Sequence, residues 1–218
     1  MRLRLIQVFM NNSLRGMEGV FMVPARPARV LSRRFRRVSF HVMTRLDPIN
    51  EDSPGVDAEL LRAIQARRGG ELLNLDRQLL HSAPLARGWN ALMGAIRGQT
   101  QLDGALRELV ILRVAVLNRA PYEFAQHAPV ALAEGLSQAQ VDAVADWQGS
   151  TLFDARTRDV LAYADAMTLQ VQVPKGLFDA LRAHLDDREL VELTATVAAY
   201  NMVSRFLEAL QIEIEPAP

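Results

Sequence analysis

The chain has 218 residues, of which 50% are hydrophobic and 23% are charged, a length and apolar content that support a packed core and exclude a mainly disordered protein. It contains no cysteine, which excludes disulfides, thiolate nucleophiles, redox dithiols and iron–sulfur clusters. Aromatic residues make up only 6%, and the abundance of Ala, Leu, Val and Arg favours helices over strands.

The formal net charge of zero hides an uneven distribution along the chain. Residues 1–42 hold nine arginines and a single acid, Glu18, which leaves 16 basic and 24 acidic residues for 43–218. This acidic remainder is a poor candidate for nucleic-acid binding. No apolar run approaches the roughly 20 residues of a membrane span.

The Arg-rich leader lacks a sustained apolar stripe, and we expect it to be disordered or to be a misassigned start. Three interpretations are open: an organelle transit peptide, a basic tail that binds phosphates, or a true start at Met43 rather than Met1. We expect residues 43–218 to form a single helical domain.

From Val56 onward, apolar residues recur at spacings of three and four, and the pattern stops at Gly69-Gly70. This spacing predicts a helix followed by a break. A short helix around Leu79 and a helix over 84–98 follow, the latter with a proline in its first turn.

Residues 103–118 form the most apolar helix candidate, because their apolar positions cover nearly the whole circumference. We expect this helix to be central and buried. Later helices are predicted over 121–134, 154–167, 174–185 and 187–211. Another helix is predicted to begin after 134, at a capping box formed by Ser137 and Gln140. Asp186 or Asp187 is the expected N-cap of the last helix. A short extended link is expected at 171–173.

Four polar side chains lie in two of these apolar helices. Glu108 belongs to 103–118, and Tyr122, Glu123 and His127 follow Pro121. Glu123 and His127 are four residues apart, so they share a helical face and can form an acid–base pair. Glu108 needs a partner, because an unpaired carboxylate in an apolar helix costs stability.

The segment 107–137 resembles the carboxymuconolactone decarboxylase family, which includes the alkylhydroperoxidase D (AhpD)-like proteins, and the resemblance covers about residues 70–212. The hydroperoxidase branch has a Glu, eleven residues, a Cys-x-x-Cys pair, three residues and a His. Glu108 and His127 match the first and last positions, and Ala120 and Glu123 stand at the two cysteine positions. Gly135-Leu136-Ser137 and Tyr200-Asn201 with Arg205 also match. The resemblance implies an all-α, AhpD-like multi-helix bundle that is oligomeric, as a trimer or hexamer.

The lack of cysteine helps to decide which branch of the family this chain resembles. Thiol peroxidase chemistry needs one thiolate to attack the peroxide and a second sulfur to resolve the sulfenic acid. The family resemblance would therefore be the only support for a peroxiredoxin activity, because the chain has neither sulfur that the reaction needs. The decarboxylase branch needs no thiol, and its resemblance implies cofactor-free proton transfer on a small unsaturated or lactone carboxylic acid.

On this hypothesis His127 supplies the proton. We expect burial to raise the pKa of Glu108, which would relay a proton or orient the imidazole, while Glu123 fixes its tautomer and Tyr122 donates to a substrate oxygen. Arg113 or Arg205 would bind a substrate carboxylate, although each could equally pair with an acid. Each residue also has an ordinary structural interpretation: a helix-dipole partner for Glu123, a core histidine for His127, packing for Tyr122.

Three functions are open at this point: a carboxy-lyase-like enzyme, which we favour, a binding or assembly module that has lost its dithiol, and a peroxidase-related oxidoreductase with an external reductant. The histidines show no metal-binding spacing, and no phosphate loop or nucleophile elbow is present, so we expect neither metal nor cofactor. The expected partners are a small organic acid and further copies of the chain, without nucleic acid or membrane, in the cytoplasm.

Overall fold

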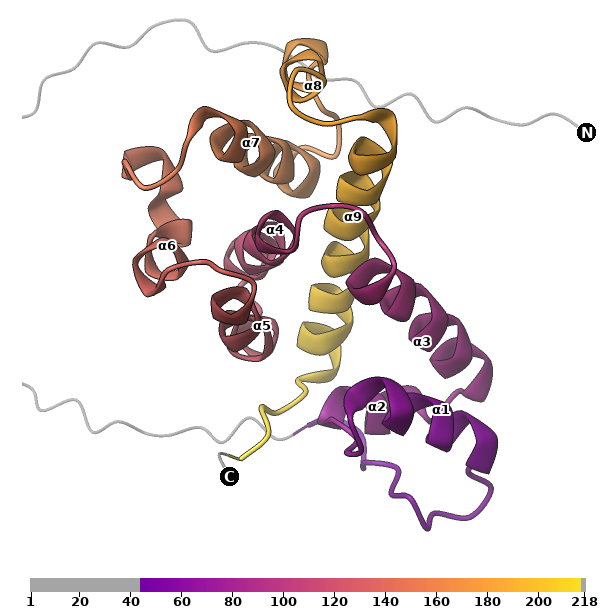
Figure 1. Ribbon diagram of the computed structural model, residues 1–218. Coiled ribbons are helices and arrows are strands. Elements are labelled where there is room, and N and C mark those ends of the chain that lie inside the picture. Colours follow the sequence, from indigo (N-terminus) through magenta and orange to yellow (C-terminus); the bar gives the residue numbers. More distant parts are fainter. Residues whose placement is uncertain (1–43, 217–218) are drawn as a thin grey trace, which may run out of the picture. The chain divides into compact units, whose positions relative to one another are not determined.

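The computed structural model describes residues 44–216; the leader and both alternative starts lie outside the described residues. Within them the regular elements are all helical, which confirms the all-α prediction. None of the described helices is both long and apolar enough to cross a membrane. In chain order (Figure 1) the elements are α1 (Ala58–Arg68), α2 (Asn74–Leu79), α3 (Ala83–Gly98), α4 (Gly104–Asn118), α5 (Pro121–Ala133), α6 (Gln138–Ala143), the 3-10 helix η1 (Val144–Gly149), α7 (Ala155–Leu169), α8 (Lys175–Leu181) and α9 (Asp187–Leu210).

Helix α4 is the centre of the helical domain, as its apolar circumference predicts. Every residue from Leu106 to Ala115 is buried, and the helix packs against α5, α7 and α9. Figure 1 shows α4 enclosed by these three helices, with α9 as the longest element. A helix that is apolar on all sides can be stable only where neighbours cover all of them.

Side-chain caps set where several helices begin. The Asp103 carboxylate accepts the Leu106 N–H at 3.0 Å and opens α4. Ser137 and Gln140 form the predicted capping box. Asp186, rather than Asp187, caps α9. Each of these acceptors satisfies a backbone donor that the first helical turn leaves unpaired.

Two local predictions are wrong. The link at 171–173 is not extended throughout, because Val171 has φ +67°. This left-handed value is strained for a β-branched residue, and it turns the chain between α7 and α8. Helix α8 ends at Leu181, four residues before the predicted end. No sequence pattern predicted the 3-10 helix η1.

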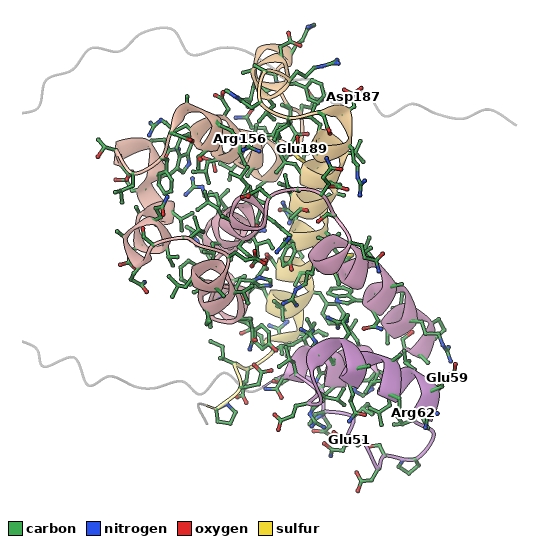
Figure 2. The ribbon with its side chains drawn as sticks, viewed as in Figure 1. Glu51, Glu59, Arg62, Arg156, Asp187 and Glu189 are labelled. Atoms are coloured by element: carbon green, nitrogen blue, oxygen red, sulfur yellow. The ribbon has the colours of Figure 1, made fainter. Side chains whose placement is uncertain are left out.

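The N-terminal half of α9 meets α7 through surface charges as well as apolar contacts. Figure 2 shows Arg156 of α7 beside Glu189 of α9, where their charged atoms lie 3.8 Å apart. The C-terminal half of α9 instead packs against α3 and α5. Helix α9 thereby connects the two ends of the bundle and passes beside the polar groups of α4 and α5.

Candidate functional site

Glu108 and His127 are in direct contact. The loop between α4 and α5 is short because Arg119 takes a left-handed conformation and Pro121 starts the next helix at once. This brings His127 Nδ1 to 2.6 Å from Glu108 Oε2. Glu108 is 1% exposed and His127 6%, so bulk water does not screen the contact.

Glu108 is held as a carboxylate. Burial alone would raise its pKa, but hydrogen bonds from His127 and Arg107, together with the Arg107 charge, outweigh burial and lower it. Arg107 Nε donates to Glu108 Oε1 at 3.2 Å, and another nitrogen of the same guanidinium donates to Glu134 at 2.8 Å. The expectation of a raised pKa is therefore wrong, because the hydrogen bonds that Glu108 accepts, first from His127 and then from Arg107, outweigh the effect of burial.

His127 is the neutral member of this pair. Burial lowers the pKa of His127 more than the Glu108 carboxylate raises it. A neutral imidazole beside a carboxylate donates its Nδ1–H, which leaves the Nε2 lone pair free to accept a proton. The ring of Tyr200 stands at 89° to the imidazole with centroids 4.9 Å apart, and it restricts the ring's orientation.

Glu123 does not orient His127, contrary to our expectation; Glu108 does. Glu123 instead accepts a hydrogen bond from the Ser204 hydroxyl through Oε2, while its Oε1 has no partner among the residues that the structure describes. Burial raises the pKa of Glu123 to about 8, opposed by the Ser204 hydrogen bond and reinforced by the charge of Glu208. At neutral pH Glu123 is mainly a protonated carboxylic acid that can donate a proton.

Glu123, His127 and Tyr200 line one cavity of about 50 Å³ between α3, α5 and α9, enough for roughly three or four water molecules. The Tyr200 hydroxyl is buried and has no hydrogen-bond partner within residues 44–216. The other lining residues are Arg67, Arg68, Leu73, Leu75, Trp89, Met93, Arg97, Tyr122, Gln126, Val203 and Leu207. A protonated acid, a neutral base and a tyrosine hydroxyl thus line one cavity whose walls combine charged, polar and apolar side chains, the arrangement of an acid–base site.

Tyr122 lines the same cavity, but its hydroxyl is engaged by the C-terminal segment. It donates to Glu215 Oε1 at 2.5 Å, and the Gln126 amide donates to Glu215 Oε2 at the same distance. The Asn74 N–H also donates to Glu215, at 2.7 Å. Burial and then Glu215 raise the pKa of Tyr122. In this conformation Tyr122 closes the site and has no free proton for a substrate oxygen.

Arg113 and Arg205 do not line the cavity. Arg113 donates twice to Asp165, at 2.5 and 2.9 Å, and to the carbonyls of Val144 and Ala145. This buried network fixes η1 to α4 and α7. Arg205 is exposed and bonds Asn201 of its own helix. The structure therefore brings together Glu108, Glu123, His127 and Tyr122 but leaves both arginines elsewhere.

Sequence reasoning missed the arginines that do reach the cavity, namely Arg67, Arg68 and Arg97. It also missed Ser204, the partner of Glu123, 81 residues away along the chain. No local pattern links these positions to α5. In residues 44–216, no group of three or more His, Asp or Glu side chains is placed to hold a metal ion.

The family model for the carboxymuconolactone decarboxylase family matches residues 83–166, which hold Glu108, Glu123 and His127. This part of the chain is similar to that family. The chain is 35% identical over 121 residues to the uncharacterized protein YnjA of Escherichia coli K12. That match covers 53% of this chain and 64% of YnjA, less than two thirds of its length.

Solved structures share the fold at low identity. An uncharacterized peroxidase-related protein from Silicibacter sp. TM1040 is 19% identical, with a TM-score of 0.68 over 79% of this chain and 92% of that one. The debrominase Bmp8 is 20% identical, with a TM-score of 0.65 over 77% and 90%. An AhpD-core protein from Ralstonia eutropha JMP134 is 19% identical, with a TM-score of 0.65 over 73% and 87%. The domain has the AhpD-like fold, and the absence of cysteine from the chain means that it lacks the Cys-x-x-Cys pair.

Proposed function

We propose that the domain is a cofactor-free, carboxy-lyase-like enzyme that acts on a small unsaturated or lactone carboxylic acid. The observation that carries this proposal is the pairing of a protonated acid, Glu123, with a neutral base, His127, on one cavity. Solved relatives include a debrominase and peroxidase-related proteins, so the fold alone does not select a reaction. The choice rests on the residues in the cavity.

The chemistry needs only these residues. When the carbon–carbon bond to the departing carboxylate breaks, CO₂ leaves and the electron pair moves into the adjacent unsaturated carbonyl system. One proton must then be added to carbon. Glu123 holds that proton in the resting site, and His127 Nε2 can accept a proton from solvent and return it, with Glu108 stabilising the imidazolium. The Tyr200 hydroxyl, which has no other partner, can donate to the oxygen on which negative charge develops.

The test is loss of ultraviolet absorbance of 4-carboxymuconolactone with the full chain. We expect His127→Ala to lower kcat by at least about 10²-fold, the usual contribution of one acid–base group. His184→Ala is the matched control, because His184 pairs with Asp159 at the surface, and it should stay within about twofold of the parent. No turnover by the parent protein would overturn the decarboxylase proposal and favour a binding module or another oxidoreductase.

The rate should also depend on pH through Glu123. Its proton is mostly present below about pH 8 and mostly absent above, so kcat/KM, which reports the free enzyme, should fall as pH rises through that value. In Glu123→Gln this descending limb should disappear together with most of the activity. A descending limb that persists in the variant would remove Glu123 from the proton path.

We further propose that the protein associates with copies of itself in the cytoplasm. Large apolar side chains lie on the surface of the helical domain, including Val191, 68% exposed, and Leu169, 64% exposed. Burying such residues is the usual gain from association. Light scattering during size-exclusion chromatography should give a multiple of 24.3 kDa, and a monomer at micromolar concentration would contradict this.

A further inference from the structure

Three arginines surround the entrance to the cavity. Arg67 and Arg68 close α1, and Arg97 lies in the last turn of α3. All three line both the inner cavity and a wider hollow of about 750 Å³ outside it. Gln126 of α5 also lines both spaces, so the hollow leads directly to the face of α5 that carries His127.

The positive charge at this entrance is only partly neutralised. Arg68 donates twice to the buried Asp76 carboxylate, at 2.8 and 3.0 Å, and Arg67 reaches the same carboxylate at 3.5 Å. The Arg97 side chain has no hydrogen bond or ion pair to any described residue. Burial, followed by repulsion from Arg68, lowers the pKa of Arg67 to about 10, which is the response expected where cations are crowded. Glu71 adds one exposed carboxylate to the rim of the hollow.

The surrounding backbone leaves space for a ligand beside these side chains. Two glycines of α3, Gly94 and Gly98, line the hollow. A Cβ at Gly94 would lie 3.5 Å from Arg67 Cδ, so a larger residue there would fill the space next to the guanidinium. Trp89, Met93 and Leu207 add apolar walls to the inner cavity, which the same arginines also line. Guanidinium charge beside hydrocarbon matches an organic anion with a short apolar body.

We propose that Arg97, together with Arg67 and Arg68, binds a carboxylate of a small organic acid and directs its apolar part toward His127 and Glu123. The guanidinium fork matches the two oxygens of a carboxylate. This inference rests on the proposed function in one respect: it places the reacting carbon of that substrate in the inner cavity.

The test is a heteronuclear NMR titration of the full chain with crotonate, its neutral isostere crotonamide and inorganic phosphate. We expect crotonate to shift signals around Arg97, crotonamide to shift none, and phosphate to bind more weakly than crotonate. Arg97→Gln should raise the crotonate Kd about tenfold, the usual effect of one charge-assisted contact. Arg62→Gln is the matched control, because Arg62 is an exposed arginine of the same helix as Arg67, outside both spaces (Figure 2), and its Kd should not change.

If Arg97→Gln and the parent bind crotonate with the same Kd, the subsite is overturned. The same holds if the parent binds crotonamide as tightly as crotonate. A third outcome is that phosphate binds more tightly than crotonate and that Arg97→Gln loses phosphate binding. This result would identify the ligand as a phosphate rather than a carboxylate and would overturn the proposal.

The two proposals fail separately. Crotonate binding that depends on Arg97, without turnover of 4-carboxymuconolactone, supports the subsite and contradicts the reaction. Turnover with an unchanged KM in Arg97→Gln supports the reaction and contradicts the subsite.

Discussion

Replacing Glu123 by glutamine should change how the stability of the fold depends on pH. The carboxyl group ionises near 4.5 in an unfolded chain, but burial raises its pKa to about 8 in the folded protein. Between these values the folded state binds more protons than the unfolded state. The Glu123 contribution to the free energy of unfolding therefore decreases as pH rises from about 4.5 to about 8 and is constant above.

The size of the effect follows from the pKa difference. Each pKa unit corresponds to about 1.4 kcal/mol, so the shift from 4.5 to about 8 gives a loss on the order of 3–5 kcal/mol by pH 9. Glutamine resembles the neutral acid in shape and can still accept the Ser204 hydroxyl. We expect Glu123→Gln to match the parent near pH 4.5 and to exceed its stability by that amount at pH 9.

Urea unfolding followed by circular dichroism at several pH values between 4.5 and 9 measures the difference between variant and parent. Glu51→Gln is the control, because Glu51 is an exposed carboxylate near the N-terminus of the described chain (Figure 2); it should not alter the pH slope. Parallel pH profiles for Glu123→Gln and the parent would refute the argument that a buried neutral acid lies in this cavity.

Three further changes test the contacts around the site. Glu108→Gln removes the charge that holds the imidazole, so ¹⁵N chemical shifts of His127 should change from one Nδ1–H tautomer to a mixture, and an unchanged spectrum would contradict the assigned orientation. Asp165→Ala leaves the Arg113 guanidinium buried without its acid and should cost about 2–4 kcal/mol in urea unfolding, whereas a loss under about 0.5 kcal/mol would contradict a structural role. Glu215→Ala frees the Tyr122 hydroxyl and should increase amide hydrogen exchange in residues 211–216; unchanged protection would show that this carboxylate does not fasten the C-terminal segment.

The identity and burial of α4 could be predicted from sequence because they depend on local composition. A helix that is apolar on every side has only one stable place in a bundle. The same holds for the caps at Ser137 and Asp186, where the side chain and the backbone donor are three residues apart. The Glu108–His127 contact was within reach because a short loop joins their helices.

The electrostatic state of the site depended on tertiary structure. His127 and Arg107 lower the pKa of Glu108 against the effect of burial, and the hydroxyl that Glu123 accepts comes from Ser204, 81 residues away along the chain. Arg113 is a similar case, since nothing near it in the sequence indicates that Asp165 is its ion-pair partner.

The helical fold class, the central position of α4 and the lack of cysteine chemistry all follow from the order and kinds of residues along the chain. Helix period, capping distances and composition are properties of neighbouring residues, so no contact between distant segments is needed to predict them. The ionised carboxyl group, the protonated one and the arginines that face the cavity became identifiable only in the folded protein. Burial and charge act through space, between residues whose separation in the sequence carries no information about their distance in the fold.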